Sequence, residues 1–192
     1  MWNEACFAHV VRDLPTGVSI AEYFGGVGIF TTILQHSLRP RVHHVFDLDP
    51  DCARQLEFAF KGHDGMHTGQ ADAKLAMGSI LADIVVLDFP VGNVRFLERD
   101  WPIWRVFRGK PRFVIWSDTA LRKIGFFRDL YSQFFGAPVH TYDDYIRCYN
   151  RWLWHRYRYT ITRVARNYYA YYLAQPLRAM ATPEVTAFTV AA

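Results

Sequence analysis

A glycine-rich turn follows an apolar stretch near the start of this 192-residue chain. Residues 18–24 are mostly apolar and carry the acid Glu22, the turn is Gly25-Gly26-Val27-Gly28, and residues 29–37 have a composition suited to a helix. Glycines in such a turn tolerate positive φ and let a ligand approach the backbone, while the following helix offers free N–H groups at its start. The stretch therefore predicts a strand, a tight loop and a helix that form a candidate cradle for a nucleotide-like ligand.

Two kinds of nucleotide site use a turn of this type. The dinucleotide fingerprint Gly-x-Gly-x-x-Gly needs a third glycine, but Thr31 follows here. An acid four residues before the central glycine and another glycine two residues after it, here Glu22, Gly26 and Gly28, resemble motif I of the Rossmann-like (class I) S-adenosylmethionine (SAM) dependent methyltransferases. The resemblance implies that these three residues, together with Gly25, hold SAM.

A second strand is predicted within residues 42–50, and it closes on Asp47. This acid lies 19 residues after the last glycine of the turn, close to where a doubly wound sheet carries the carboxylate that hydrogen-bonds a ribose. We therefore predict that Asp47 binds the adenosyl ribose, with Leu48 beside it at the cofactor. Asp49 is better explained as the N-cap of a helix over residues 51–60.

A short, weak strand at residues 66–69 leads to Asp72 and Ala73. Methyltransferases usually have an acid or amide here that reads the adenine amino group, so the resemblance implies cofactor contacts from Asp72 and Ala73. Asp72 also suits the N-cap of a helix over residues 73–80, and the two roles are compatible.

The fourth predicted strand, residues 82–90, is a continuous apolar run that ends in Asp88-Phe89-Pro90. Such a run is typical of a parallel strand covered on both faces. Methyltransferases that act on nucleobase nitrogens carry (Asp/Asn)-x-Pro at this strand end, and with the glycine turn the motif is most similar to the tRNA guanine methyltransferases, over residues 18–92. The resemblance implies that Asp88 accepts a hydrogen bond from the target nitrogen while Phe89 and Pro90 shape the pocket.

Val91 departs from both related patterns. Enzymes that methylate amino groups usually have an aromatic residue here that stacks on the base, so Phe89 or a remote aromatic would take that role. DNA cytosine-5 methyltransferases have a nucleophilic cysteine directly after the proline. Valine is no nucleophile, which disfavours the covalent cytosine mechanism.

Charge is divided unevenly along the chain. Residues 1–92 hold 6 Lys/Arg and 11 Asp/Glu, whereas residues 93–192 hold 16 and 7, so a cationic half follows an acidic half. An anionic partner is indicated, with RNA preferred over DNA.

Between residues 92 and 111 arginines alternate with aromatics, a pattern suited to phosphate contacts and base stacking. The candidate substrate-binding residues are Arg95, Arg99, Trp101, Trp104, Arg105 and Arg108. The alternative is an amphipathic helix whose aromatics pack on the sheet while its arginines stay in water.

The remaining patterns complete an α/β chain. They predict a helix at residues 3–13, a strand at 112–116, helices at 120–135 and from 143, and strands at 159–166 and 168–174. The expected fold is a three-layer Rossmann-like methyltransferase fold with a mostly parallel seven-stranded sheet and a C-terminal antiparallel hairpin. We expect a single domain over 1–192, with an N-terminal helix (1–17), a cofactor-binding half (18–92), a substrate-side half (93–180) and a tail (181–192).

Composition excludes several classes of protein. The chain is 51% apolar and 17% aromatic, which excludes a disordered protein. No apolar run approaches the roughly 20 residues of a membrane span, and the first residues do not resemble a signal peptide, so we expect a cytoplasmic protein without membrane contact. Three scattered cysteines suggest reduced thiols. His63 and His67 have helix-like spacing, but the glycines flanking Asp64 argue against a helix, so no metal site is expected.

These features together predict a SAM-dependent methyltransferase that modifies a nucleobase nitrogen of RNA, or of DNA. Loop or single-stranded RNA avoids part of the cost of flipping a base out of a duplex. Two alternatives stay open: a methyltransferase for small molecules or proteins, and a catalytically inactive protein with the SAM-methyltransferase fold retained as a scaffold subunit. A protein partner or a homo-oligomer is compatible with each of them.

Overall fold

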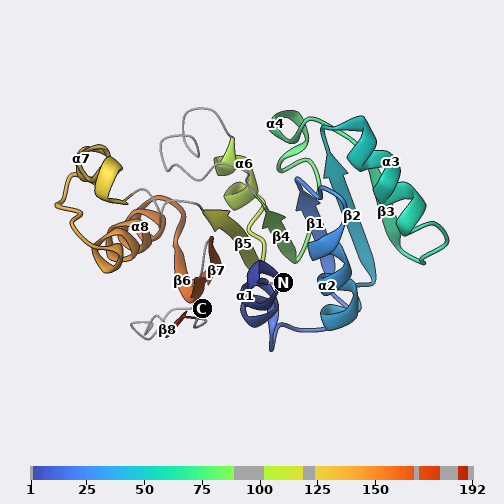
Figure 1. Ribbon diagram of the computed structural model, residues 1–192, viewed down its shortest axis with the longest axis horizontal. Helices are drawn as coiled ribbons and strands as arrows, with labels where there is room; N and C mark the ends of the chain where they lie inside the picture. Colours follow the sequence, from blue (N-terminus) through green and yellow to red (C-terminus); the bar gives the residue numbers. More distant parts are fainter. Residues whose placement is uncertain (1, 89–101, 119–123, 167–168, 178–185, 190–192) are drawn as a thin grey trace.

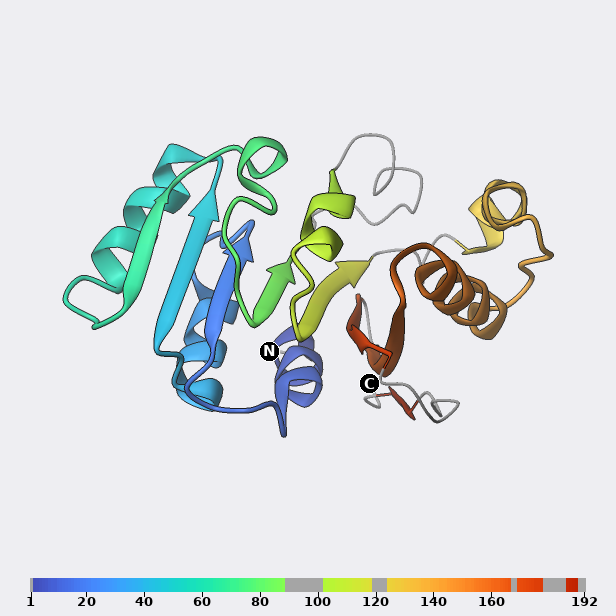
Figure 2. The same ribbon diagram turned by 180° about the vertical axis from the view of Figure 1, so that it is seen from behind.

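The computed structural model describes residues 2–88, 102–118, 124–166, 169–177 and 186–189, and Figures 1 and 2 show it from opposite sides. A single mixed sheet runs through the molecule with the strand order β3-β2-β1-β4-β5-β7-β6-β8. The strands are β1 Ser19–Tyr23, β2 Val42–Asp47, β3 Met66–Gln70, β4 Ile84–Leu87, β5 Phe113–Asp118, β6 Tyr159–Arg166, β7 Ala170–Pro176 and β8 Thr186–Thr189. The first five are mutually parallel, so their carboxyl ends meet at one edge of the sheet.

Helices cover both faces of this sheet. They are α1 Trp2–Val11, α2 Ile29–Leu38, α3 Pro50–Ala59, α4 Ala73–Ala76, α6 Ile103–Arg108, α7 Ile124–Phe135 and α8 Tyr142–Tyr157. One core cluster joins α1 and α2 to the sheet through buried side chains such as Phe7, Leu34 and Val86. A larger cluster on the other face includes Phe107 of α6 and Leu153 of α8. None of the described helices is long and apolar enough to cross a membrane.

The predicted fold class is confirmed. Strand β7 lies between β5 and β6 and is antiparallel to both, which is the C-terminal hairpin that the sequence indicated. An eighth strand, β8, pairs in parallel with β6 at the edge of the sheet, although residues 181–192 were expected to form a tail. Its four residues are too few to show a recognisable alternation of apolar and polar side chains.

Helix α4 is shorter than predicted, and α6 bears on an alternative that the sequence left open. Helix α4 ends at Ala76, four residues before the predicted end, because the chain turns at Gly78 with a φ of +78°. Within the segment of alternating arginines and aromatics, residues 103–108 form α6, which buries Ile103, Val106 and Phe107. The amphipathic-helix interpretation therefore holds for the helix and for Phe107, but not for Trp104, which is 46% exposed.

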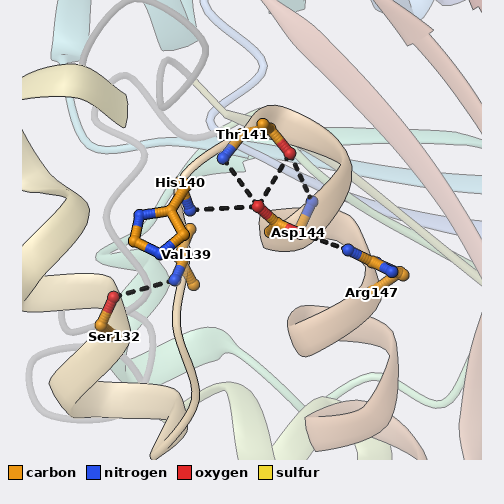
Figure 3. Close-up of polar contacts among 6 residues, drawn as sticks. All are labelled: Ser132, Val139, His140, Thr141, Asp144 and Arg147. Atoms are coloured by element: carbon orange, nitrogen blue, oxygen red, sulfur yellow. Dashed lines mark hydrogen bonds and ion pairs between the residues drawn. The ribbon is translucent and has the colours of Figure 1, made fainter.

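A compact polar turn fixes the start of α8 (Figure 3). The Thr141 hydroxyl accepts a hydrogen bond from the Asp144 N–H at 3.1 Å, and Asp144 Oδ2 accepts from the N–H groups of His140 and Thr141 at 3.1 and 2.9 Å. The Thr141 hydroxyl also donates to Asp144 Oδ2 at 2.9 Å, and this hydrogen bond, followed by those from the two N–H groups, holds the pKa of Asp144 well below its usual range. The arrangement is a capping box, which satisfies N–H groups that the first turn of a helix leaves open.

Helix α8 then reaches the sheet through a buried aromatic row. Tyr145, Tyr149 and Leu153 are all almost fully buried, and the Tyr145 hydroxyl donates to Asp118 Oδ2 at 2.5 Å. Because Asp118 is the last residue of β5, this hydrogen bond connects α8 to the carboxyl edge of the sheet.

Replacing Thr141 with alanine tests the capping box. Thr141→Ala removes the acceptor for the Asp144 N–H, so we expect a loss of about 1 kcal/mol in the free energy of unfolding, measured by urea denaturation. Thr141→Ser keeps the hydroxyl and should stay within about 0.5 kcal/mol of the wild type. Equal stability of the alanine and serine variants would contradict the assigned role.

Candidate functional site

A cavity of about 430 Å³ lies at the carboxyl edge of the sheet beside the glycine turn. Helices, strand ends and the antiparallel hairpin all contribute to its lining, which consists of Asn3, Phe24, Gly26, Phe30, Asp47, Asp88, Ser117, Tyr169 and Tyr171. Three of the predicted site residues, Gly26, Asp47 and Asp88, therefore share one cavity. They come from the turn after β1 and from the ends of β2 and β4.

The glycine turn needs its glycines for separate reasons. A Cβ on Gly25 would lie 2.5 Å from Val45 Cγ1, so a side chain there would collide with the core under α3. Gly28 has a φ of +86° and precedes the first turn of α2. Gly26 has a φ of +53°, and a Cβ there would meet nothing within 4 Å. Its backbone therefore faces open space and can be approached by a ligand.

Asp47 connects the glycine turn to the end of β2 through a hydrogen bond. Its Oδ2 accepts a hydrogen bond from the Gly26 N–H at 2.8 Å, and its Oδ1 accepts from the Asp49 N–H at 2.9 Å. Leu48, the next residue, is 60% exposed. An exposed leucine beside a carboxylate gives this strand end one apolar and one anionic surface. Asp49 accepts hydrogen bonds at the start of α3, as the N-cap prediction requires.

Glu22 lies beneath this surface and is fully buried. His43 of β2 contacts Glu22 Oε2 through its Nε2 at 3.0 Å, and its Nδ1 lies 2.9 Å from Gln35 Nε2. Because the glutamine nitrogen can only donate, the His43 Nδ1 accepts and its Nε2–H donates to Glu22. The second oxygen, Oε1, has no hydrogen-bond partner among the described residues.

Asp88 follows β4 directly, and its carboxyl group lines the same cavity as Asp47. Burial raises its pKa to about 6, the charge of Glu22 adds to the rise, and a hydrogen bond from Ser117 opposes it. The carboxyl group is therefore largely ionised at pH 7 and becomes neutral below about pH 6. A half-buried carboxylate with a raised pKa at a strand end is a common feature of functional sites.

Asp72 and Ala73 lie at the start of α4. Asp72 Oδ1 accepts from the Lys74 N–H at 2.8 Å, so the N-cap role is present. The structure shows no described residue donating to the other carboxylate oxygen of Asp72. Ala73 is buried in the core. Neither residue lines the cavity around Asp88.

The predicted substrate-binding residues fall into two groups. Trp104, Arg105 and Arg108 lie on α6 and line a different hollow, beside α4. Phe89, Pro90, Arg95, Arg99 and Trp101 lie outside the described residues. Across the described ranges, no group of three metal-ligating side chains is present, and His67 stacks on His44 with ring centroids 4.7 Å apart.

The sequence alone did not single out several lining residues: Asn3, Phe24, Phe30, Ser117, Tyr169 and Tyr171. Ser117 had a usable signal, because it ends a predicted strand as Asp88 does. Tyr169 and Tyr171 reach the cavity only because β7 is inserted antiparallel beside β5, which brings its first residues to the carboxyl edge. Asn3 and Phe30 project from helices, and no local motif marks them.

Comparisons with known proteins identify the fold. No family model matches the chain, and no curated protein sequence matches it. Among solved structures, Trm1 from Pyrococcus horikoshii, solved with SAM, superposes with a TM-score of 0.66 at 14% identity over 91% of this chain and 54% of its own. The chain thus spans about half the length of that protein.

Two further neighbours act on different kinds of substrate. The Bacillus subtilis M1A22 tRNA methyltransferase TrmK gives a TM-score of 0.57 at 11% identity, over 90% of this chain and 64% of its own. The ribosomal protein L11 methylase from Lactobacillus delbrueckii subsp. bulgaricus gives 0.58 at 12% identity, over 91% and 77%. The fold is therefore that of the class I SAM-dependent methyltransferases, as the resemblance implied.

Substituting Asp88 should change stability in a pH-dependent way. Its pKa is about 6 in the folded protein and 3.8 in a free carboxyl group, so ionisation disfavours the folded state as pH rises through this window. Asp88→Asn removes that cost, and we expect it to raise the free energy of unfolding by about 1–3 kcal/mol at pH 8. At pH 4 the two proteins should differ by only about 0.5 kcal/mol, because Asp88 is then neutral in the folded state and about half neutral in the unfolded state.

Urea denaturation between pH 4 and pH 8 measures this difference. Asp129→Asn is the control, because the Asp129 side chain is 87% exposed and should change stability by no more than about 0.5 kcal/mol. An Asp88→Asn protein that gains no stability at pH 8 would show that the buried carboxylate carries no such cost.

Proposed function

We propose that this protein is a SAM-dependent methyltransferase that transfers a methyl group to a nucleobase nitrogen of RNA. The observation that carries the proposal is the shared cavity: the open backbone of the glycine turn, the Asp47 carboxylate and the Asp88 carboxyl group all line it. The fold and the Asp-Phe-Pro motif support the same assignment.

The residues around the turn fit an adenosyl cofactor. Gly26 leaves room for close approach to its backbone. Asp47, at the end of β2, would accept hydrogen bonds from ribose hydroxyls, and the exposed Leu48 would cover one face of the adenine. Asp72 would accept from the adenine amino group through the oxygen that does not cap α4. These acceptor groups are thus suited to the hydroxyls of a neutral sugar and the amino group of a purine.

Bound SAM supplies an electrophilic methyl group on a sulfonium. The protein would contribute alignment and exclusion of water, which can supply roughly 7–11 kcal/mol of a displacement barrier. Asp88, when ionised, would accept a hydrogen bond from the target nitrogen and keep its lone pair directed at the methyl group. Ser117 stabilises the ionised form of Asp88, so it would act as a positioning residue for that acceptor.

A protein or small-molecule substrate is the second candidate. The likeness to a ribosomal protein methylase favours it. The nucleobase assignment rests on Asp88-Phe89-Pro90 and on the basic second half of the chain, which a protein substrate leaves unexplained. Binding to RNA would weaken steeply with salt because phosphate contacts release counterions, whereas binding of an uncharged substrate would not.

Calorimetric titration with SAM and S-adenosylhomocysteine tests the cofactor site. Asp47→Ala should weaken binding of both compounds about 10- to 100-fold, because it removes charge-assisted hydrogen bonds to the ribose and loosens the Gly26 backbone. Asp49→Ala, which removes the neighbouring N-cap, should leave the affinity within about twofold. A wild-type protein that binds neither compound would overturn the enzymatic assignment and favour the scaffold alternative.

The pH dependence of methyl transfer tests the role of Asp88. The rate of single-turnover transfer of labelled methyl groups to an unmodified tRNA transcript should fall as pH drops through about 6. Below that pH the Asp88 carboxyl group is neutral and is a weaker hydrogen-bond acceptor for the target nitrogen. Ser117→Ala removes a hydrogen bond that lowers the Asp88 pKa, so the acidic limb should move to higher pH. Asp88→Ala should abolish transfer while leaving SAM affinity nearly intact. Activity that survives Asp88→Ala would contradict the active-site assignment.

A further inference from the structure

A second hollow, of about 410 Å³, lies between the end of α4 and helix α6. Its lining residues are Leu75, Met77, Gly78, Ser79, Leu81, Trp104, Arg105, Arg108 and Gly109, and none of them lines the Asp88 cavity. Figures 1 and 2 both show α4 and α6 side by side, on the part of the sheet next to β4. The hollow is therefore a separate surface feature.

Backbone packing holds this hollow in shape. A Cβ on Gly78 would lie 2.6 Å from Arg105 Cβ and 2.9 Å from the Arg105 carbonyl oxygen, so the turn after α4 contacts the α6 backbone directly. On its opposite side α6 buries Ile103, Val106 and Phe107 in the core. Trp104, Arg105 and Arg108 are left on the outer surface, at fixed positions around the hollow.

The hollow combines exposed apolar surface with positive charge. Trp104 is 46% exposed, and Leu75 and Leu81 are about three-quarters exposed, at 75% and 76%. The Arg105 guanidinium lies 5.4 Å from the centroid of the Trp104 ring. Residues 73–82 and 102–112 contain no acid, and their basic residues are Lys74, Arg105, Arg108, Lys110 and Arg112. An anionic ligand with a flat apolar part fits this combination.

We propose that the hollow binds an unpaired nucleotide of the RNA substrate, with its base stacked on Trp104 and its phosphates at Arg105 and Arg108. This inference rests on the proposed function, because it assumes an RNA substrate. It adds a contact outside the methyl-transfer cavity, at a nucleotide other than the one that is methylated. An indole face accepts any base, so this contact contributes affinity and orientation and little sequence preference.

The chain offers a matched control for this site. Trp154 on α8 is 40% exposed, and the Arg158 guanidinium lies 4.8 Å from its ring centroid. It therefore repeats the Trp–Arg pair in a basic part of the chain, but it lines neither this hollow nor the Asp88 cavity. If RNA affinity falls in the Trp104 variant and not in the Trp154 variant, the hollow itself contributes to binding, and an exposed Trp–Arg pair in a basic region is not enough.

Fluorescence anisotropy with a labelled 12-nucleotide single-stranded RNA and with a tRNA transcript measures the site. Trp104→Ala should weaken binding about 5- to 150-fold, the range for loss of one base–aromatic stack, and Trp104→Phe should recover part of it. Trp154→Ala should stay within about twofold. The Arg105→Gln/Arg108→Gln double variant should lower the slope of log Kd against log salt by about 1.4, as expected for two phosphate contacts to a single strand.

Several outcomes would overturn the inference. The first is RNA binding that does not change in Trp104→Ala, and the second is an equal loss of affinity in Trp104→Ala and Trp154→Ala. The third is a wild-type protein that does not bind RNA. The fourth is displacement of the RNA by poly-glutamate that binds with the same dependence on Trp104. The last would identify an acidic protein as the occupant.

Calorimetry with SAM on the same variants separates this inference from the proposed function. Trp104→Ala should bind SAM as the wild type does, because the hollow shares no residue with the Asp88 cavity. A wild type that binds RNA through Trp104 but binds no SAM would support the nucleotide site and overturn the methyltransferase assignment. A wild type that binds SAM and methylates RNA without using Trp104 would support the methyltransferase assignment and overturn the nucleotide site.

Discussion

A single carboxylate at the end of β2 determines the geometry on which the candidate site depends. Asp47 accepts one hydrogen bond from the Gly26 N–H and one from the Asp49 N–H, so it joins the turn after β1 to the start of α3. With that connection in place, the unobstructed backbone of Gly26 is directed at the cavity. The parallel register of β1, β2 and β4 then brings Asp88 to the same edge.

Burying polar groups beneath that edge costs stability. Glu22 is fully buried, and His43 satisfies only one of its two oxygens among the described residues. The negative charge of Glu22 adds to the raised pKa of Asp88 on the adjacent strand. A fold selected for stability alone would place apolar residues there, because a buried acid without full pairing is destabilising. The arrangement is easier to explain by a requirement of the site than by packing.

The sequence could predict the features that depend on local chemistry. The glycine turn and the acids at strand ends follow from short motifs, and the rule that parallel strands end at one edge places them together. The position of Trp104 could not be predicted, since it depends on contact between Gly78 and Arg105 across the fold. The same holds for Tyr171, which reaches the cavity only through the insertion of β7 beside β5.

The charge division along the chain also has a different meaning in the structure. The Arg163 guanidinium donates to the carbonyl oxygens of His9, Val10 and Arg12 at the end of α1. Its charge therefore stabilises the fold and is not free to bind a polyanion. Arg166 lies over the ring of Tyr142, 4.7 Å from its centroid. Net charge therefore overstates the cationic surface that a polyanion can reach. Exposed arginines that line a hollow beside an aromatic ring are a better guide. On α6, Arg105 and Arg108 meet this condition beside Trp104, whereas Arg158, beside Trp154, lines neither the hollow nor the Asp88 cavity.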